Sequence, residues 1–162
     1  MASLTVFKFN TPEGASQMLE KVQSLQKLEL IKVQDAAIVT WPQGKDKPKT
    51  KQLVNMAGMG ALNGAFWGML FGLIFFVPFF GLAVGAAMGA LTGKMADYGI
   101  SDEFIKTTRE KVTEGTSALF LMTSDAVQDK VAAELKGYEF ELIASNLTKE
   151  QEEQLMAAFS EE

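Results

Sequence analysis

The chain has 162 residues, 48% of them hydrophobic, a formal net charge of −5, and neither cysteine nor histidine. The length favours one domain, and the net acidic charge argues against a nucleic acid partner, because nucleic acid binding relies on a basic surface. The absence of cysteine and histidine removes disulfides, thiolates and the commonest general base and metal ligand, so we expect no enzyme activity, no cofactor, no metal and no small-molecule substrate.

Residues 1–44 predict a strand, a helix and a second strand, the first half of a soluble domain. Residues 3–9 alternate between apolar and polar side chains, as a half-buried strand does. The Thr-Pro-Glu sequence at 11–13 predicts a helix start, and apolar residues follow at helical spacing. Residues 30–41 are rich in β-branched side chains, which indicates a strand, and we expect a bulge near Asp35.

The middle of the chain carries no charge. Residues 1–52 contain eight lysines and five acidic residues, residues 53–93 contain no charged residue, and residues 94–162 contain seven basic and fifteen acidic residues. A helix needs about 20 apolar residues to cross a hydrocarbon core of about 30 Å, so the uncharged stretch has room for two crossings. We therefore expect a transmembrane helical hairpin at 53–96, preceded by a basic linker at 45–52.

Pro78 marks the expected turn of this hairpin, because proline lacks a backbone donor and disfavours helix at Val77. The two arms are then residues 53–76 and 79–95. In the membrane Asn63 would form a hydrogen bond across helices or at a helix end. Glycines at every fourth position predict a zipper, which pairs either the two arms of one chain or the hairpins of neighbouring chains. These glycines are Gly60, Gly64, Gly68, Gly72, Gly81, Gly85, Gly89 and Gly93.

Lysines on both sides of the hairpin predict its orientation. The positive-inside rule places both chain ends in the cytoplasm, which gives a multi-pass or hairpin-inserted protein of the inner membrane. Because the tip has no polar loop, the hairpin either just reaches the far interface or forms a wedge in one leaflet. The alternative is a hairpin buried in a soluble core, disfavoured because little other protein remains to cover it. The flanking residues are Lys45, Lys47, Lys49, Lys51 and Lys94.

Residues 97–162 predict the second half of the soluble domain, in the order α-β-α-β-α. Capping signals at 101–102 and 148–151 indicate helix starts, and strands are expected at 117–122 and 138–144. A strand-helix-strand unit at each end of the chain is the pattern of a split β-α-β sandwich. The expected fold class is therefore α+β: a ferredoxin-like cytoplasmic domain with an inserted two-helix glycine-zipper membrane hairpin.

Three segments carry a resemblance to a known family. They are GALNGAFWGMLFGLIFFVPFFGLAVGAAMGALTGKMADYGISDEFI, GTSALFLM and the closing LTKEQEEQL. Together they resemble the uncharacterised bacterial predicted membrane-protein family that is number 1269 in the series of domains of unknown function. The resemblance covers nearly the whole chain and implies membrane location and bacterial origin. It transfers no catalytic residue.

These patterns lead us to expect a non-enzymatic integral membrane protein that self-associates as a structural or membrane-shaping scaffold. Its partners would be the lipid bilayer and other copies of the chain, through edge strands and through the charge difference between the two halves. The acidic half folding back on the basic half within one domain explains that difference equally well. Two other hypotheses are a small oligomeric channel or permeability protein, which an uncharged hairpin disfavours, and a membrane-tethered ligand-binding sensor or adaptor.

Overall fold

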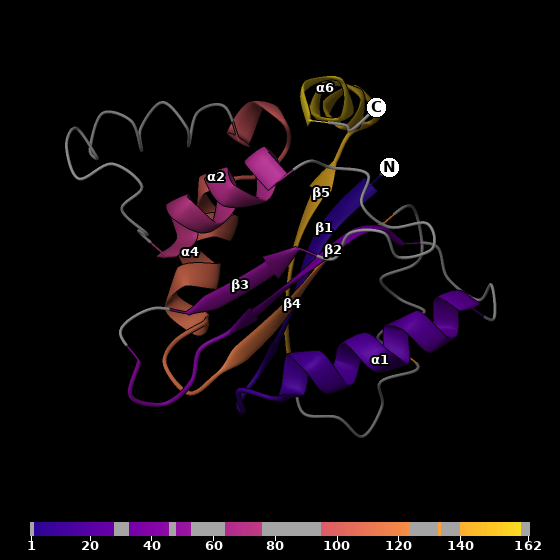
Figure 1. Ribbon diagram of the computed structural model, residues 1–162. Helices are drawn as coiled ribbons and strands as arrows, with labels where there is room; N and C mark the ends of the chain where they lie inside the picture. The colour runs from indigo at the N-terminus through magenta and orange to yellow at the C-terminus, as the bar shows by residue number, and fades with distance from the viewer. Residues whose placement is uncertain are drawn as a thin grey trace.

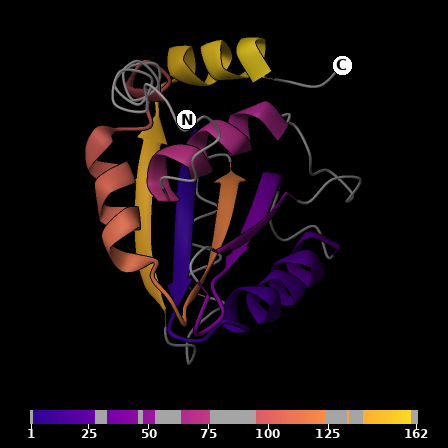
Figure 2. The same ribbon diagram turned by 60° about the vertical axis from the view of Figure 1, so that its left-hand side comes forward.

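The computed structural model places nine labelled helices and strands within the residues it describes (Figure 1). Figure 1 shows one central sheet with α1 on one side and α2 and α4 on the other. Figure 2 shows the same arrangement from another side, with α6 lying across one end of the sheet. The structure describes residues 2–27, 33–45, 48–52, 64–75, 95–123, 133 and 140–159.

The first elements are β1 (Ala2–Phe9), α1 (Gly14–Lys27) and β2 (Val33–Thr40). They confirm the strand, helix and strand that the patterning of this segment predicts. The pairing of β2 with β4 shifts register between Val33 and Asp35, which confirms the expected bulge. Ser117 fixes the start of α1, because its hydroxyl accepts a hydrogen bond from the backbone N–H of Ala15 at 2.9 Å.

The sheet has the strand order β3-β2-β4-β1-β5, and all neighbouring pairs are antiparallel. The remaining strands are β3 (Lys49–Gln52), β4 (Ser117–Thr123) and β5 (Glu141–Leu147). β4 lies between β1 and β2, so the two strands that α1 connects are not neighbours. Residues 49–52, expected in a linker, instead extend one edge of the sheet.

Two helices of the second half begin at the caps that the sequence indicates. The Ser101 hydroxyl accepts a hydrogen bond from the backbone N–H of Phe104 and caps α4 (Asp102–Lys111). Before α6 (Lys149–Phe159), the side chains and backbones of Thr148 and Gln151 bond each other reciprocally, at 2.8 and 3.1 Å. Such reciprocal bonds satisfy donors that a helix start otherwise leaves unpaired.

Each face of the sheet supports its own apolar core. On one face α1 contributes Met18 and Val22, which pack against alternate residues of β1, β2 and β4 such as Phe7. On the other face α2 (Gly64–Phe75), α4 and α6 cover the opposite set of side chains, among them Phe120. Successive side chains of a strand point to opposite faces of the sheet, so strands with apolar residues at both sets of positions give two apolar faces, and helices cover both.

The expected membrane hairpin is wrong, and with it the expected fold class. Within the described part of the chain, no helix has both the length and the apolar composition needed to cross a bilayer. The described part of the first arm is α2, which has 12 residues and packs on the sheet. Alternating apolar and polar side chains in the strands predict a sheet with one face exposed to water. In the structure both faces are apolar, and α2 helps to cover the second one. The fold is a five-stranded antiparallel sheet with helices on both faces.

The corrections extend to the expectations that depend on the hairpin. The integral membrane scaffold, the channel, the membrane tether and the inner-membrane location with cytoplasmic ends all depend on the expected membrane hairpin, and the same finding overturns them. Hydropathy does not distinguish the two environments, because it measures how strongly a segment avoids water, and a protein core satisfies that preference as well as lipid does. The turn at Val77 and Pro78 lies outside the described residues, as does the second arm before Met95.

Candidate interaction site at the sheet edges

The candidate functional site is formed by the two edge strands, β3 and β5. Each is hydrogen-bonded to one neighbouring strand only within the part of the sheet that the structure describes. An edge strand presents backbone N–H and C=O groups to any extended chain that approaches it, so proteins usually protect edges with charge, shortness or a cover. The two edges of this sheet differ in length, in charge and in the exposure of an apolar side chain.

β5 is the longer edge, and it pairs with β1 along its whole length from Glu141 to Leu147. Its side chains alternate, so that Ile143, Ser145 and Leu147 are buried while the residues between them are exposed. Leu142 is 41% exposed, and among the described residues no other large hydrophobic side chain is exposed. Leu142 is therefore the apolar side chain that this edge offers to an added strand.

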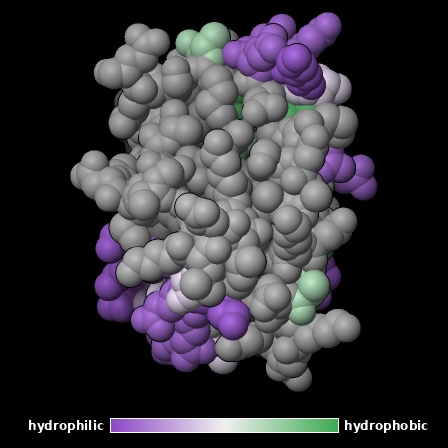
Figure 3. All heavy atoms as spheres, turned by 90° about the vertical axis from the view of Figure 1, so that its right-hand side faces the viewer, coloured by the Kyte–Doolittle hydropathy of each residue, from purple (hydrophilic) through white to green (hydrophobic). Residues whose placement is uncertain are grey.

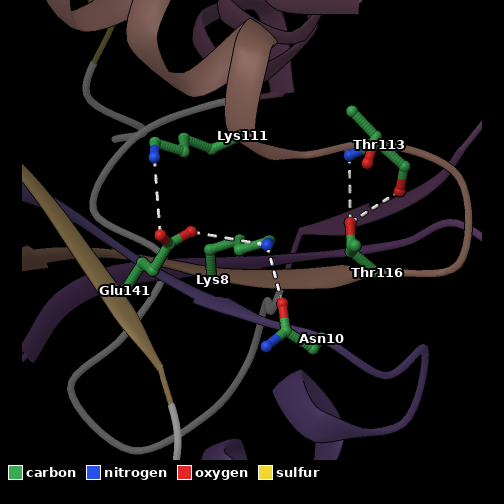
Figure 4. A network of polar contacts seen from close by, with 6 residues as sticks. All are labelled: Lys8, Asn10, Lys111, Thr113, Thr116 and Glu141. Atoms are coloured by element: carbon green, nitrogen blue, oxygen red, sulfur yellow. Dashed lines mark hydrogen bonds and ion pairs between the residues drawn. The ribbon is translucent and has the colours of Figure 1, made fainter.

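A network of charged side chains fixes the start of β5 (Figure 4). The Glu141 carboxylate lies 3.4 Å from the Nζ atom of Lys8 and 3.4 Å from that of Lys111, and Lys8 also donates to Asn10 at 2.8 Å. Partial burial raises the pKa of Glu141, but the hydrogen bonds and charges of Lys8 and Lys111 outweigh it and hold this pKa below its ordinary value of 4.5. Glu141 therefore stays ionised and ties β5 to β1 and α4.

The other end of β5 is held by the turn before α4 and by α6. The Ser145 hydroxyl donates to the carbonyl of Gly99, whose φ of +93° is in the left-handed region that favours glycine. A Cβ atom at Gly99 would lie 2.7 Å from Oε1 of Gln151, the residue that caps α6. β5 thus contacts other elements at both of its ends.

β3 is the shorter edge, with four residues, and its charge is positive. Lys49, Thr50 and Lys51 are all exposed. Lys45 is exposed as well, and its carbonyl accepts a hydrogen bond from the indole N–H of Trp41 at 2.8 Å. A short, lysine-rich edge resists pairing with its own copy, because like charges would face each other.

Two polar contacts attach α2 to the sheet and to α4, and the sequence patterns indicate neither of them. Asp35 is fully buried, and its carboxylate accepts hydrogen bonds from the backbone N–H of Ala36 at 2.8 Å and from the indole N–H of Trp67 at 3.1 Å. Arg109 donates to the carbonyls of Leu73 and Ile74 at the last turn of α2. The one available signal was an acidic residue inside an apolar, β-branched segment.

The described residues contain no group of three or more acidic side chains that could hold a metal ion. Among the buried polar groups there, the Ser117 hydroxyl donates to the carbonyl of Thr11, whereas the Thr5 hydroxyl has no hydrogen-bond partner. The two sheet edges offer backbone groups for pairing, and one edge is partly apolar while the other is basic.

Comparison with protein families identifies the chain's relatives. A family model described as a protein of unknown function, DUF1269, matches residues 61–160. The chain belongs to this family. Neither the curated proteins nor the solved structures contain a match. Membership confirms the resemblance inferred from the sequence over these residues, but the family's description states nothing about membranes or a bacterial source.

The DUF1269 match begins at residue 61, so β1, α1, β2 and β3 precede it and β5 lies within it. Of the glycines expected in a zipper, Gly64, Gly68 and Gly72 belong to α2, and Gly72 is buried. Of the flanking lysines, the structure brings Lys49 and Lys51 into β3 and places Lys45 before it. The other predicted residues lie outside the described part: Lys47, Gly60, Asn63, Gly81, Gly85, Gly89, Gly93 and Lys94.

Proposed function

We propose that this member of the DUF1269 family is a non-catalytic protein whose function is self-association, through antiparallel pairing of β5 with β5 of a second copy. The observation that carries the proposal is the contrast between the edges. β3 is short and basic, whereas β5 has seven residues and exposes Leu142. Because charge protects β3 from pairing while β5 remains partly apolar, we infer that β5 is the edge used for pairing.

The pairing has two-fold symmetry, because the same strand contributes from both copies. If Ala144 lies on the axis, it faces Ala144 of the second copy, and Leu142 faces Asn146 of the second copy. Ala144 is small and exposed, so the two strands can approach without displacing a larger side chain. The ion pairs of Glu141 with Lys8 and Lys111 then stay within each copy at the ends of the joined strands.

The contact is small and its strength is correspondingly modest. Stable interfaces bury about 1,200–2,000 Å² in total, more than a single pair of seven-residue strands is able to supply. We therefore expect an association that depends on concentration, with backbone hydrogen bonds and Leu142 as its main sources of free energy. The absence of cysteine and histidine from the sequence supports a role without catalysis.

Analytical ultracentrifugation of the full chain over a range of concentrations tests this function. The expected mass rises from one chain toward two as concentration increases, and Leu142→Lys weakens the association about tenfold or more, because it replaces the apolar side chain of the contact with a charged one. Thr50→Lys on β3 is the matched control, since it adds the same charge to the opposite edge and leaves the association unchanged. A mass of one chain at every concentration, or equal weakening by both substitutions, contradicts the proposal.

A further inference from the structure

The basic edge strand β3 has a separate role. We propose that β3 is a docking edge for an extended acidic segment of another polypeptide, which adds to the sheet beside it as a further strand. This proposal concerns the edge opposite β5 and does not depend on self-association. It rests on the placement of Lys49 and Lys51, on their exposure, and on the net charge of the rest of the chain.

The register of β3 against β2 places both lysines on the same face of the sheet. Lys49 is opposite Thr40 and Lys51 is opposite Ile38, so the two side chains are alternate residues, about 7 Å apart along the strand. Both are exposed, and neither forms an ion pair with an acidic group in the described part of the chain. Their charges are therefore available to a partner.

An extended segment with acidic residues at alternate positions matches this arrangement. Paired beside β3, it places a carboxylate next to each lysine, while backbone hydrogen bonds along the edge supply most of the binding free energy. An exposed ion pair contributes only about 0–1 kcal/mol, so the lysines act mainly by selecting acidic strands and rejecting basic ones, including a second β3.

The chemistry of this edge favours a polypeptide over a nucleic acid. The chain carries a net charge of −5, so the field around the rest of the molecule repels a long polyanion. At this edge the described positive charges are those of Lys45, Lys49 and Lys51, which span only a few residues and suit a short segment. A polypeptide also brings backbone N–H and C=O groups at strand spacing, which a sugar-phosphate backbone does not have.

Figure 3 shows another part of the surface for comparison, the side facing right in Figure 1. The described side chains visible there are mainly hydrophilic, in groups at the height of α6 and of α1. The exposed described residues of α6 include Glu150 and Glu153, whereas those of β3 are two lysines and a threonine. The local charge therefore distinguishes β3 from α6.

The test measures binding of a fluorescent synthetic peptide, with glutamate alternating with threonine and valine, to the full chain by anisotropy. We expect saturable binding that weakens as salt increases. The double variant Lys49→Glu/Lys51→Glu should lower affinity at least about tenfold, and the same peptide with lysine replacing glutamate should then bind this variant better than the natural chain. A peptide with proline at the positions that pair with β3 should bind weakly, because it lacks backbone donors.

The control is Lys106→Glu/Lys149→Glu, which makes the same change in net charge at exposed positions on α4 and α6. Equal loss of binding by both double variants contradicts the proposal, because it indicates an effect of net charge alone. If an oligonucleotide of the same charge binds as tightly as the acidic peptide, the proposal is contradicted, because the edge then selects negative charge and not a polypeptide strand. If Lys49→Glu/Lys51→Glu has a lower assembly mass than the natural chain in the absence of peptide, the proposal is contradicted, because β3 then contacts another copy of the chain.

Discussion

At the residue scale, Glu141 shows how one half-exposed carboxylate organises the start of an edge strand. Its side chain is 48% exposed, and Lys8 and Lys111 lie on either side of it. The two lysines lower its pKa below the ordinary 4.5, despite partial burial, which raises it. A lowered pKa in the folded state means that ionised Glu141 stabilises the fold above pH 4.5, and that this contribution disappears as pH falls through the folded-state pKa.

Glu141→Gln should therefore reduce the free energy of unfolding at neutral pH, and the difference from the natural chain should vanish at acidic pH. Because the pair is half exposed, the expected loss is below about 1 kcal/mol. Urea unfolding at a series of pH values measures it, down to the lowest pH at which both chains unfold reversibly. In a Lys111→Met background the same substitution should cost less. A loss that stays constant with pH would show that Glu141 acts through packing and not through its charge.

Asp35 illustrates a residue whose role the sequence could not show. The β-branched segment around it predicts β2 and its bulge correctly, because strand formation depends on neighbouring side chains. The partner Trp67 is 32 residues away in the sequence, on α2. No periodicity connects positions so far apart, so the buried hydrogen bond between them was beyond sequence analysis.

At the element scale, α2 explains both the strength and the failure of the sequence analysis. Caps and periodicity are local, so they locate α1, α4 and α6, whereas β5 runs from Glu141 to Leu147 and not over 138–144 as expected. The residues of α2 were correctly identified as helical and water-avoiding, but the environment that receives them depends on the whole sheet. Trp67 and Phe71 pack against Phe120 of β4, with ring centroids 6.4 and 5.1 Å apart. The edges that form the candidate site likewise follow from strand order, which only the three-dimensional structure provides.

The docking of α2 predicts the effect of Trp67→Phe. This substitution keeps an aromatic ring in the core but removes the donor to the buried Asp35 carboxylate. A buried acceptor that loses a partner costs about 1–3 kcal/mol, so the urea midpoint should fall with an unchanged slope. Trp41→Phe is the control, because the Trp41 indole bonds the carbonyl of exposed Lys45 and its loss costs less. Equal effects of the two substitutions would contradict the role of the Asp35–Trp67 contact.

At the scale of the whole molecule, the structure is a sheet covered on both faces, so its edges are the parts of the sheet left for contacts with other chains. The two edges differ in length, charge and apolar exposure, and we assign them different partners: a second copy at β5 and an acidic strand at β3. A protein with both contacts would link a dimer to other polypeptides.

Cross-linking of an introduced cysteine tests the central claim, the β5 pairing, most directly. The chain contains no cysteine, so Ala144→Cys carries a single thiol. Facing residues of an antiparallel pair have Cβ atoms about 4.5–5.5 Å apart, close enough for a disulfide after small adjustments. The account predicts that mild oxidation joins Ala144→Cys chains into covalent dimers, whereas Thr50→Cys on β3 stays monomeric. Equal dimer formation by Ala144→Cys and Thr50→Cys would contradict the account. So would a failure of Ala144→Cys and of single cysteines at positions 142 and 146 to form any dimer.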